Sequence, residues 1–143
     1  MRRLLVIIAL LGSIAATAVA LPTTAAAGTT NGTAVTWGTF WNTISVAPSA
    51  TATASGGRVY ASGNSRVVYS SGIGGAWTST STAVRVYRNG ALVSSLTCGG
   101  YACNAPSQST RGTYDVQSRF CGDRRDDGAG TKCTSWVTAR ASI

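Results

Sequence analysis

The sequence predicts an all-β protein, folded as an antiparallel β-sandwich that carries two disulfide bonds. Beyond the first 27 residues, no segment has a sustained apolar period of 3.6, and Gly, Ser, Thr, Val and Tyr dominate. Short alternating segments follow one another between turn signals, which is typical of sandwiches and barrels. The four cysteines are an even number, as a disulfide framework requires.

The N-terminus has the composition of a secretory signal peptide. Arg2 and Arg3 precede an apolar run over residues 4–11, and small residues follow. Cleavage sites lie after Ala20 and Ala27, and we favour Ala27 because a polar segment begins at Gly28. An uncleaved membrane anchor is the alternative, but the run is far shorter than the roughly 20 residues that a span needs. We expect a secreted, extracellular protein with no stable membrane insertion after signal cleavage.

Removal of residues 1–27 leaves 116 residues, enough for one domain. We expect residues 28–47 to form an extended N-terminal arm or a first strand, and residues 48–143 to form the sandwich. Nine strands are expected, at residues 33–37, 42–46, 51–55, 57–62, 65–70, 82–88, 91–97, 112–121 and 133–142. Turn signals among them occur at 62–64, 71–75, 88–90 and 98–103 and in the acidic loop between Cys121 and Cys133.

Asn89 and Gly90 predict a two-residue hairpin turn, because both residue types tolerate the positive φ of a type I′ turn. Such a turn places Val86 opposite Val93 and Tyr87 opposite Leu92. We assign one face of the hairpin to the core and leave the other as a candidate contact surface, although the reverse packing remains open. The core face carries Val84, Val86 and Val93, and the contact face carries Arg85, Tyr87, Leu92 and Leu96.

The segment GTYDVQSRFC alternates, with Tyr114, Val116, Ser118 and Phe120 on one face. Its Gly-Thr-Tyr entry, its exit cysteine and a closing strand that bears Trp136 resemble the last hairpin of an immunoglobulin-like sandwich. The resemblance covers residues 33–143 as a pattern of strands. The early cysteine and intervening tryptophan of antibody domains are absent, so the resemblance implies a fold and no functional residue.

Four cysteines in an exported domain predict two disulfides. Of the three connectivities, we favour the pairing that is local in sequence, Cys98 with Cys103 and Cys121 with Cys133. A zinc site is the alternative. It is disfavoured because the cysteine spacings do not fit and the chain has no histidine, so we expect no metal.

Residues 121–133 contain three of the four acidic side chains. We expect a hairpin tip there, at a position where immunoglobulin variable domains carry a recognition loop. The tip is either a partner-contact loop or a solvated loop that promotes solubility. A calcium loop is disfavoured because the ligands lack the alternate-residue spacing of an EF-hand. The candidate contact residues are Asp123, Arg124, Arg125, Asp126 and Asp127.

Trp37, Phe40 and Trp41 lie within five residues near the N-terminus and need a surface that covers them. In one extended strand, Trp37 and Trp41 share a face with Val35, while Phe40 shares the other face with Ile44. The strand either packs on the domain's own core or is an arm added to a partner's sheet. In the second case the three aromatic residues are partner-binding anchors.

Catalysis is not expected. The chain has no His and no Glu, a Ser-His triad is excluded, and three of the four aspartates crowd on one loop. We therefore expect no enzyme activity and no cofactor. Arg and Tyr recur together in segments 58–60, 66–69 and 85–88, which is either a basic aromatic patch on neighbouring strands or ordinary strand composition. The modest net charge favours the second interpretation, and no nucleic-acid partner is expected.

Small exported sandwiches of this kind resemble two families of high-GC Gram-positive bacteria. The neocarzinostatin-type chromophore carriers share the size, the immunoglobulin-like fold and two sequence-local disulfides, with the bridge order reversed. The small adaptor subunit of umbrella toxin particles resembles this chain in its leader and in GTTNGTAVTWGTFWN, residues 28–42, which precedes a strand-rich body. The expected function is a secreted non-catalytic binding module or adaptor for a larger secreted subunit, as in a secreted toxin particle. The alternative is a small-ligand carrier or inhibitor protein with an antimicrobial role.

Overall fold

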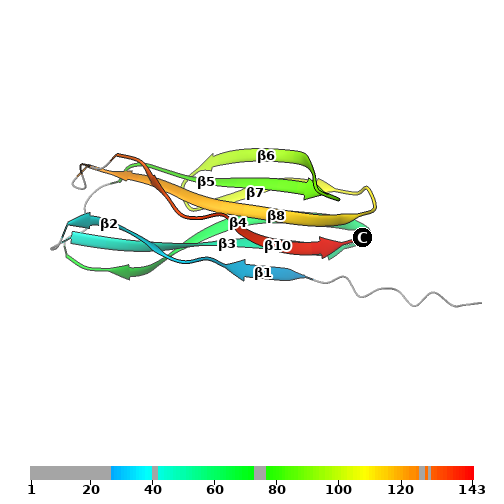
Figure 1. The fold of residues 1–143 in the computed structure, drawn as a ribbon, viewed down its shortest axis with the longest axis horizontal. Helices are drawn as coiled ribbons and strands as arrows, with labels where there is room; N and C mark the ends of the chain where they lie inside the picture. Colours follow the sequence, from blue (N-terminus) through cyan, green and yellow to red (C-terminus); the bar gives the residue numbers. More distant parts are fainter. Residues whose placement is uncertain (1–26, 40–41, 73–76, 126–127, 129) are drawn as a thin grey trace, which may run out of the picture.

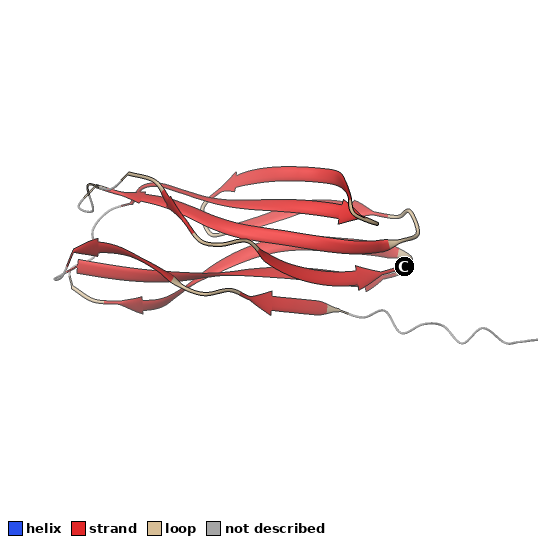
Figure 2. Cartoon of the chain, in the orientation of Figure 1, coloured by secondary structure: helices blue, strands red, loops and turns tan. Residues whose placement is uncertain are grey.

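The computed structural model describes residues 27–39, 42–72, 77–125, 128 and 130–143. These residues form ten β-strands and no helix (Figure 2). The strands are β1 (Gly28–Asn31), β2 (Val35–Thr39), β3 (Asn42–Ser55), β4 (Arg58–Ser70), β5 (Trp77–Arg88), β6 (Ala91–Gly99), β7 (Ala102–Gln108), β8 (Thr113–Arg124), β9 (Lys132–Cys133) and β10 (Val137–Ser142).

The strands form two antiparallel sheets that pack face to face (Figure 1). The first sheet has the order β1-β3-β4-β7, and β2 pairs with β3 beyond the end of β1. The second sheet has the order β10-β8-β5-β6, and β9 pairs with β8 beyond β10. Strand β3 of the first sheet packs on β8 and β10 of the second. The predicted all-β sandwich is confirmed.

The path of the chain between the sheets is that of an immunoglobulin-like fold. The β3–β4 hairpin lies in the first sheet, the β5–β6 hairpin in the second, β7 returns to the first sheet, and β8 to β10 complete the second. Tyr114 stands near the start of β8, and its hydroxyl donates a hydrogen bond to the backbone oxygen of Thr110. This contact is the tyrosine corner found in immunoglobulin-like sandwiches.

Two strands are longer than the sequence predicts. Strand β3 joins the segments expected at 42–46 and 51–55, and β4 runs through Gly63, where a turn was expected. Gly63 is required by packing, because a Cβ there would stand 2.2 Å from Oγ of Ser118 and 2.7 Å from Cγ2 of Val84 in the opposite sheet. The glycine therefore permits close approach of the sheets, and the prediction of a turn was wrong. Strand β7 was not predicted.

The predicted hairpin turn is present, with φ of 49° at Asn89 and 85° at Gly90. Tyr87 lies opposite Leu92 as predicted, but Val86 lies opposite Ser94 because the register shifts at a bulge next to it. Val84 and Val86 are fully buried, as expected of the core face. Val93 is 38% exposed, so its assignment to the core was wrong.

The N-terminal segment pairs within the domain. Strands β1 and β2 both pair with β3, and the boundary expected between residues 47 and 48 lies inside β3. The chain does not continue from Trp37 to Ile44 as one extended strand. It reverses between β2 and β3, which places Trp37 directly opposite Ile44. Ile44 therefore shares the face of Trp37, contrary to the expectation.

Both disulfides are the local pairs that the sequence predicts. Cys98–Cys103 joins β6 to β7 and so links the two sheets, while Cys121–Cys133 joins β8 to β9. Two disulfides are typical of proteins that fold in an oxidising compartment. In the described part of the chain, no helix is long and apolar enough to cross a membrane.

The interior has two regions of different composition. The alanine–valine core lies between β3, β4, β5, β8 and β10, and its buried members include Ala50, Ala52, Val59, Val84, Val86, Val116 and Ala139. The aromatic core lies at the other end, around Trp37, Val46 and Phe120. Trp77 and Tyr101 pack against it.

Candidate binding surface

The outer face of the second sheet carries three of the four residues that the sequence assigns to a contact surface, Arg85, Tyr87 and Leu92. The fourth, Leu96, lies opposite the buried Val84 and therefore on the other face, so its assignment was wrong. Arg85 and Tyr87 alternate along β5 with the buried Val84 and Val86, so their side chains lie on the solvent side. Both are half-buried. Leu92 of β6, opposite Tyr87, is 54% exposed.

Trp136, the residue before β10, lies on this face and contacts two arginines. Cζ of Arg85 is 4.5 Å from the centre of the indole ring, and Cζ of Arg119 is 4.6 Å from it. The arginines come from the neighbouring strands β5 and β8, where Ala83 is the residue opposite Arg119. We call Arg85, Arg119 and Trp136 the Arg–Trp cluster. The ring's negative faces attract both guanidinium groups and fix their positions.

The polar groups of the Arg–Trp cluster are only partly satisfied. Nε of Arg119 is buried and has no hydrogen-bond partner. Asp115, on the same face of β8, is paired with Arg140, at 2.6 Å from Oδ1 to Nε and 3.2 Å from Oδ2 to Nη2. The pKa of Arg140 is raised, first by this hydrogen bond and second by the charge of Asp115. Asp115 therefore neutralises Arg140, and the cluster keeps its own positive charge.

The cluster is suited to binding rather than to proton transfer. Two guanidinium groups supply planar arrays of N–H donors that match carboxylates, and the indole and phenol rings supply apolar area. Arginine stays protonated, so it is a poor general acid or base. Among the described residues, no group of three or more His, Cys, Asp or Glu side chains could hold a metal ion.

The acidic loop is smaller than the sequence predicts. Asp123 and Arg124 belong to β8, opposite Ser79 and Trp77 of β5. Arg124 is only 2% exposed, with its guanidinium 5.7 Å from the centre of the Trp77 ring, so its assignment to an exposed tip was wrong. Strand β8 continues past Cys121 because β5 still pairs with it there. Arg125 is exposed, whereas Asp126 and Asp127 lie outside the described residues.

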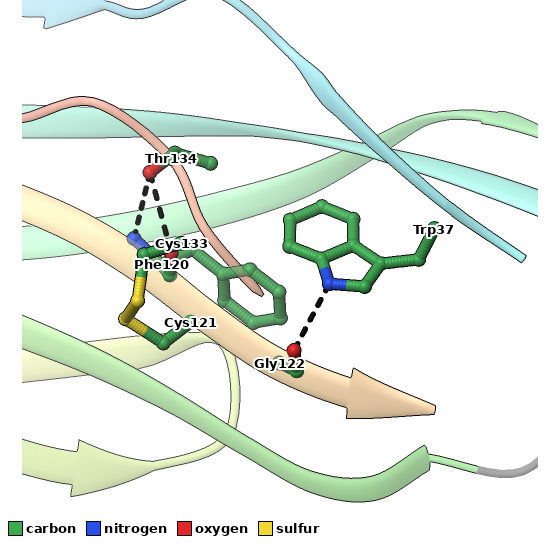
Figure 3. The surroundings of a disulfide bond; sticks show 6 residues. All are labelled: Trp37, Phe120, Cys121, Gly122, Cys133 and Thr134. Carbon is green, nitrogen blue, oxygen red and sulfur yellow. Dashed lines mark hydrogen bonds between the residues drawn. A yellow bond between two sulfur atoms is a disulfide. The ribbon is translucent and has the colours of Figure 1, made fainter. Parts of the chain in front are cut away.

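Of the three N-terminal aromatic residues, the structure describes only Trp37. Trp37 is fully buried, and its Nε1 donates a hydrogen bond of 2.9 Å to the backbone oxygen of Gly122 (Figure 3). It belongs to the domain's own core and is not an exposed anchor. Phe40 and Trp41 lie outside the described residues.

The segments rich in Arg and Tyr do not form one patch. Arg58 and Tyr60 lie on β4 in the first sheet, whereas Arg85 and Tyr87 lie on β5 in the second. The basic aromatic patch required these strands to be neighbours in a sheet. They are not, because the chain crosses between the sheets after β4.

The sequence did not predict the ring packing at the aromatic core. Phe120 makes edge contacts with Trp37 and Trp77, at centroid distances of 5.6 and 5.7 Å, and Tyr101 stacks on it at 5.1 Å. Thr134 ties the loop after β9 to this site, because its Oγ1 accepts a hydrogen bond of 3.0 Å from the backbone N–H of Phe120 (Figure 3). Burial raises the pKa of Tyr101, while a hydrogen bond with Trp77 and the charge of Arg124 act in the opposite direction.

Comparison with known proteins gave no match to a family model, to a curated protein or to a solved structure.

Proposed function

We propose that this protein is a secreted, non-catalytic binding module that serves as an adaptor for a larger secreted protein. The observation that carries the proposal is the Arg–Trp cluster, in which a half-buried tryptophan lies on the outer face of a sheet in contact with two guanidinium groups. The docking surface is the outer face of the second sheet, from Leu92 through Tyr87 to the cluster.

The residue types on this face are those that dominate protein interfaces. Trp, Tyr and Arg are enriched among the residues whose truncation weakens binding most. Arg85, Tyr87 and Arg119 are fixed on paired strands of a sheet, so they lose little conformational freedom when a partner binds. Cys121 lies two residues after Arg119 on β8, and its disulfide with Cys133 ties β9 to this strand.

The chemistry of the surface indicates a partner that presents carboxylates around an apolar spot. The guanidinium groups of Arg85 and Arg119 have no ion-pair partner among the described residues. Without Arg2 and Arg3 of the leader, ten Lys and Arg residues and four Asp residues give the exported chain a formal net charge of +6, which favours approach of an acidic surface. Binding should therefore weaken as the salt concentration rises.

Export is part of the proposal. It is supported by the basic and apolar leader at residues 1–27 and by the two disulfides, which persist in oxidising compartments. A carrier of an apolar small molecule would need a cavity with apolar walls. One cavity of about 510 Å³ lies at the end of the sandwich, but it is lined mostly by Ser, Gly and Arg111. This lining favours the adaptor over the carrier.

The test is purification from the native culture medium, followed by mass spectrometry. We expect a larger protein in stoichiometric amount. Trp136→Ala, and separately Arg85→Gln combined with Arg119→Gln, should each weaken its binding by about tenfold or more. The matched control is Tyr69→Ala, which truncates an aromatic residue that is 56% exposed on the other sheet and should leave binding unchanged.

Circular dichroism melting of each purified variant separates lost binding from lost folding. Equal binding by the wild type and the cluster variants would contradict the proposed surface. Recovery of the protein without a larger partner would contradict the adaptor role, and a bound chromophore would favour the carrier.

A further inference from the structure

We propose that the outer face of the first sheet is a second binding site, which takes a neutral polysaccharide chain in a trough beside Tyr60. This site is on the opposite side of the sandwich from the Arg–Trp cluster and does not depend on the proposed adaptor role. A cavity of about 350 Å³ lies there. We call it the Tyr60 trough, and its polar side chains are those of Thr51, Thr53, Tyr60, Ser62 and Asn104.

The pairing of three strands produces the shape of the trough. Thr51 of β3 lies opposite Ser62 of β4, and Ser62 lies opposite Asn104 of β7. These three short side chains form a row across the sheet, which spans about 10 Å because neighbouring strands are about 4.8 Å apart. In the next row along β4, Tyr60 lies opposite Thr53. The row of short side chains is the floor of the trough, and the larger Tyr60 is one wall.

The chemistry of this lining matches a sugar chain. The lining has no charged residue, and its hydroxyl and amide groups can each donate and accept hydrogen bonds, as sugar hydroxyls do. The Tyr60 side chain is 51% exposed, so its ring offers a flat apolar face to the C–H groups of a sugar ring. A sugar chain in the trough can therefore form hydrogen bonds with the floor and stack on the ring of Tyr60.

A charged polymer fits this site less well. The nearest arginine along β4 on this face is Arg58, whose Nη1 donates a hydrogen bond of 3.0 Å to Oγ of Ser107. It is not among the residues that line the trough. Phosphate or carboxylate groups in the trough would therefore lose water without meeting a positive charge there. The selectivity is for neutral chains.

The trough is ordered before a ligand arrives. Thr51 and Ser62 are held by paired strands, and Oγ1 of Thr51 is hydrogen-bonded to Oγ1 of Thr29 on β1 at 3.2 Å. Small side chains on a sheet lose little rotamer freedom on binding. The shallow floor leaves room for a chain that extends beyond the protein at either end.

The experiment measures depletion of the purified full-length mature protein from solution by insoluble cellulose, xylan and chitin. We expect saturable binding to at least one of these neutral glycans, unchanged in about 0.5 M NaCl because no ion pair is involved. Tyr60→Ala should weaken this binding about tenfold or more, since it removes the stacking face. Asn104→Ala, which removes one hydrogen-bonding group, should weaken it severalfold.

Tyr69→Ala is the matched control, because Tyr69 is 56% exposed on the same strand but outside the trough. It should bind as the wild type does, and melting curves should show that all variants fold. Binding to none of the three glycans would overturn the proposal. So would equal binding by Tyr60→Ala and the wild type, or binding that high salt abolishes, which would indicate electrostatic adsorption. Trp136→Ala should keep full glycan binding, so failure of one proposed site is distinguishable from failure of the other.

Discussion

The two ends of the sandwich interior are built in different ways. In the alanine–valine core, short side chains recur at every second position, as in Ala50, Ala52 and Ala54 of β3. In the aromatic core, Trp37, Trp77, Tyr101 and Phe120 come from β2, β5, the turn after β6, and β8. The first end depends on a repeated local pattern. The second depends on four rings, far apart in sequence, that meet at one point.

The difference indicates where each end is vulnerable. Short side chains let the sheets approach closely, so the alanine–valine core should resist the loss of a methyl group better than the addition of one. Large rings make many contacts each, so the aromatic core should be damaged most by truncation. The glycines at the two ends, Gly63 and Gly122, allow both ideas to be tested.

The largest expected effect is that of Trp37→Ala. It removes edge contacts with Trp77 and Phe120 and leaves the backbone oxygen of Gly122 without its hydrogen bond. We expect a loss of about 4 kcal/mol in the free energy of unfolding, compared with about 2 kcal/mol for Val59→Ala in the other core. Urea unfolding of both variants measures the difference. If Trp37→Ala unfolded at the same urea concentration as the wild type, Trp37 would not be a core residue. The hypothesis that this segment is an arm for a partner's sheet would then be favoured again.

The second prediction compares the stability lost when a methyl group is added at Gly63 and at Gly122. In Gly63→Ala, the new Cβ would clash with Ser118 and Val84 across the sandwich, so the sheets must separate. In Gly122→Ala, it would stand 2.4 Å from Cζ3 of Trp77, a half-buried ring that can shift outward. We expect losses of about 3 kcal/mol and about 2 kcal/mol respectively.

Gly99→Ala is the matched control for this pair, because no atom lies within 4 Å of the added Cβ and the φ angle is not positive. It should unfold close to the wild type in urea. A larger loss for Gly122→Ala than for Gly63→Ala would mean that the aromatic end, rather than the alanine–valine end, is the tighter of the two.

The smallest effect is a pH dependence at the aromatic core. Burial raises the pKa of Tyr101 above its usual 10.0, so the folded state holds the phenol proton more tightly than the unfolded state does. The resulting stability is complete below pH 10 and is lost as pH rises through the folded pKa. We expect the melting temperature of the wild type to fall more steeply than that of Tyr101→Phe as the pH rises above 10. Parallel curves for the two proteins would exclude this contribution.

Local patterns were sufficient for much of the fold. Alternation along 112–121 gave the buried set Tyr114, Val116, Ser118 and Phe120, and cysteine spacing gave both disulfides. The Asn-Gly pair gave the hairpin turn. Each of these features depends on residues close together in sequence. The predicted register fails beyond Tyr87, because a bulge places Val93 as one extra residue in β6 between the pairs Tyr87–Leu92 and Val86–Ser94.

The candidate binding surface required information that the sequence lacks. Alternation places Arg85 and Arg119 on the outer sides of their strands, but only the pairing of β5 with β8 brings both to Trp136. The Tyr60 trough likewise needs β7, a strand that contains Pro106 and was not predicted. Tertiary pairing therefore determined the sites, while local patterns determined most of the strands that carry them.

The order of the cysteines has a consequence for how the chain matures. Partners are separated by 5 and 12 residues, and neither pair encloses or overlaps the other. Because a chain is synthesised from its N-terminus, Cys98 and Cys103 become available to react before Cys121 does. Each thiol meets its native partner over the shortest available loop, which is the least costly closure in entropy. Correct oxidation can thus proceed stepwise during emergence, without reshuffling of a mispaired bond.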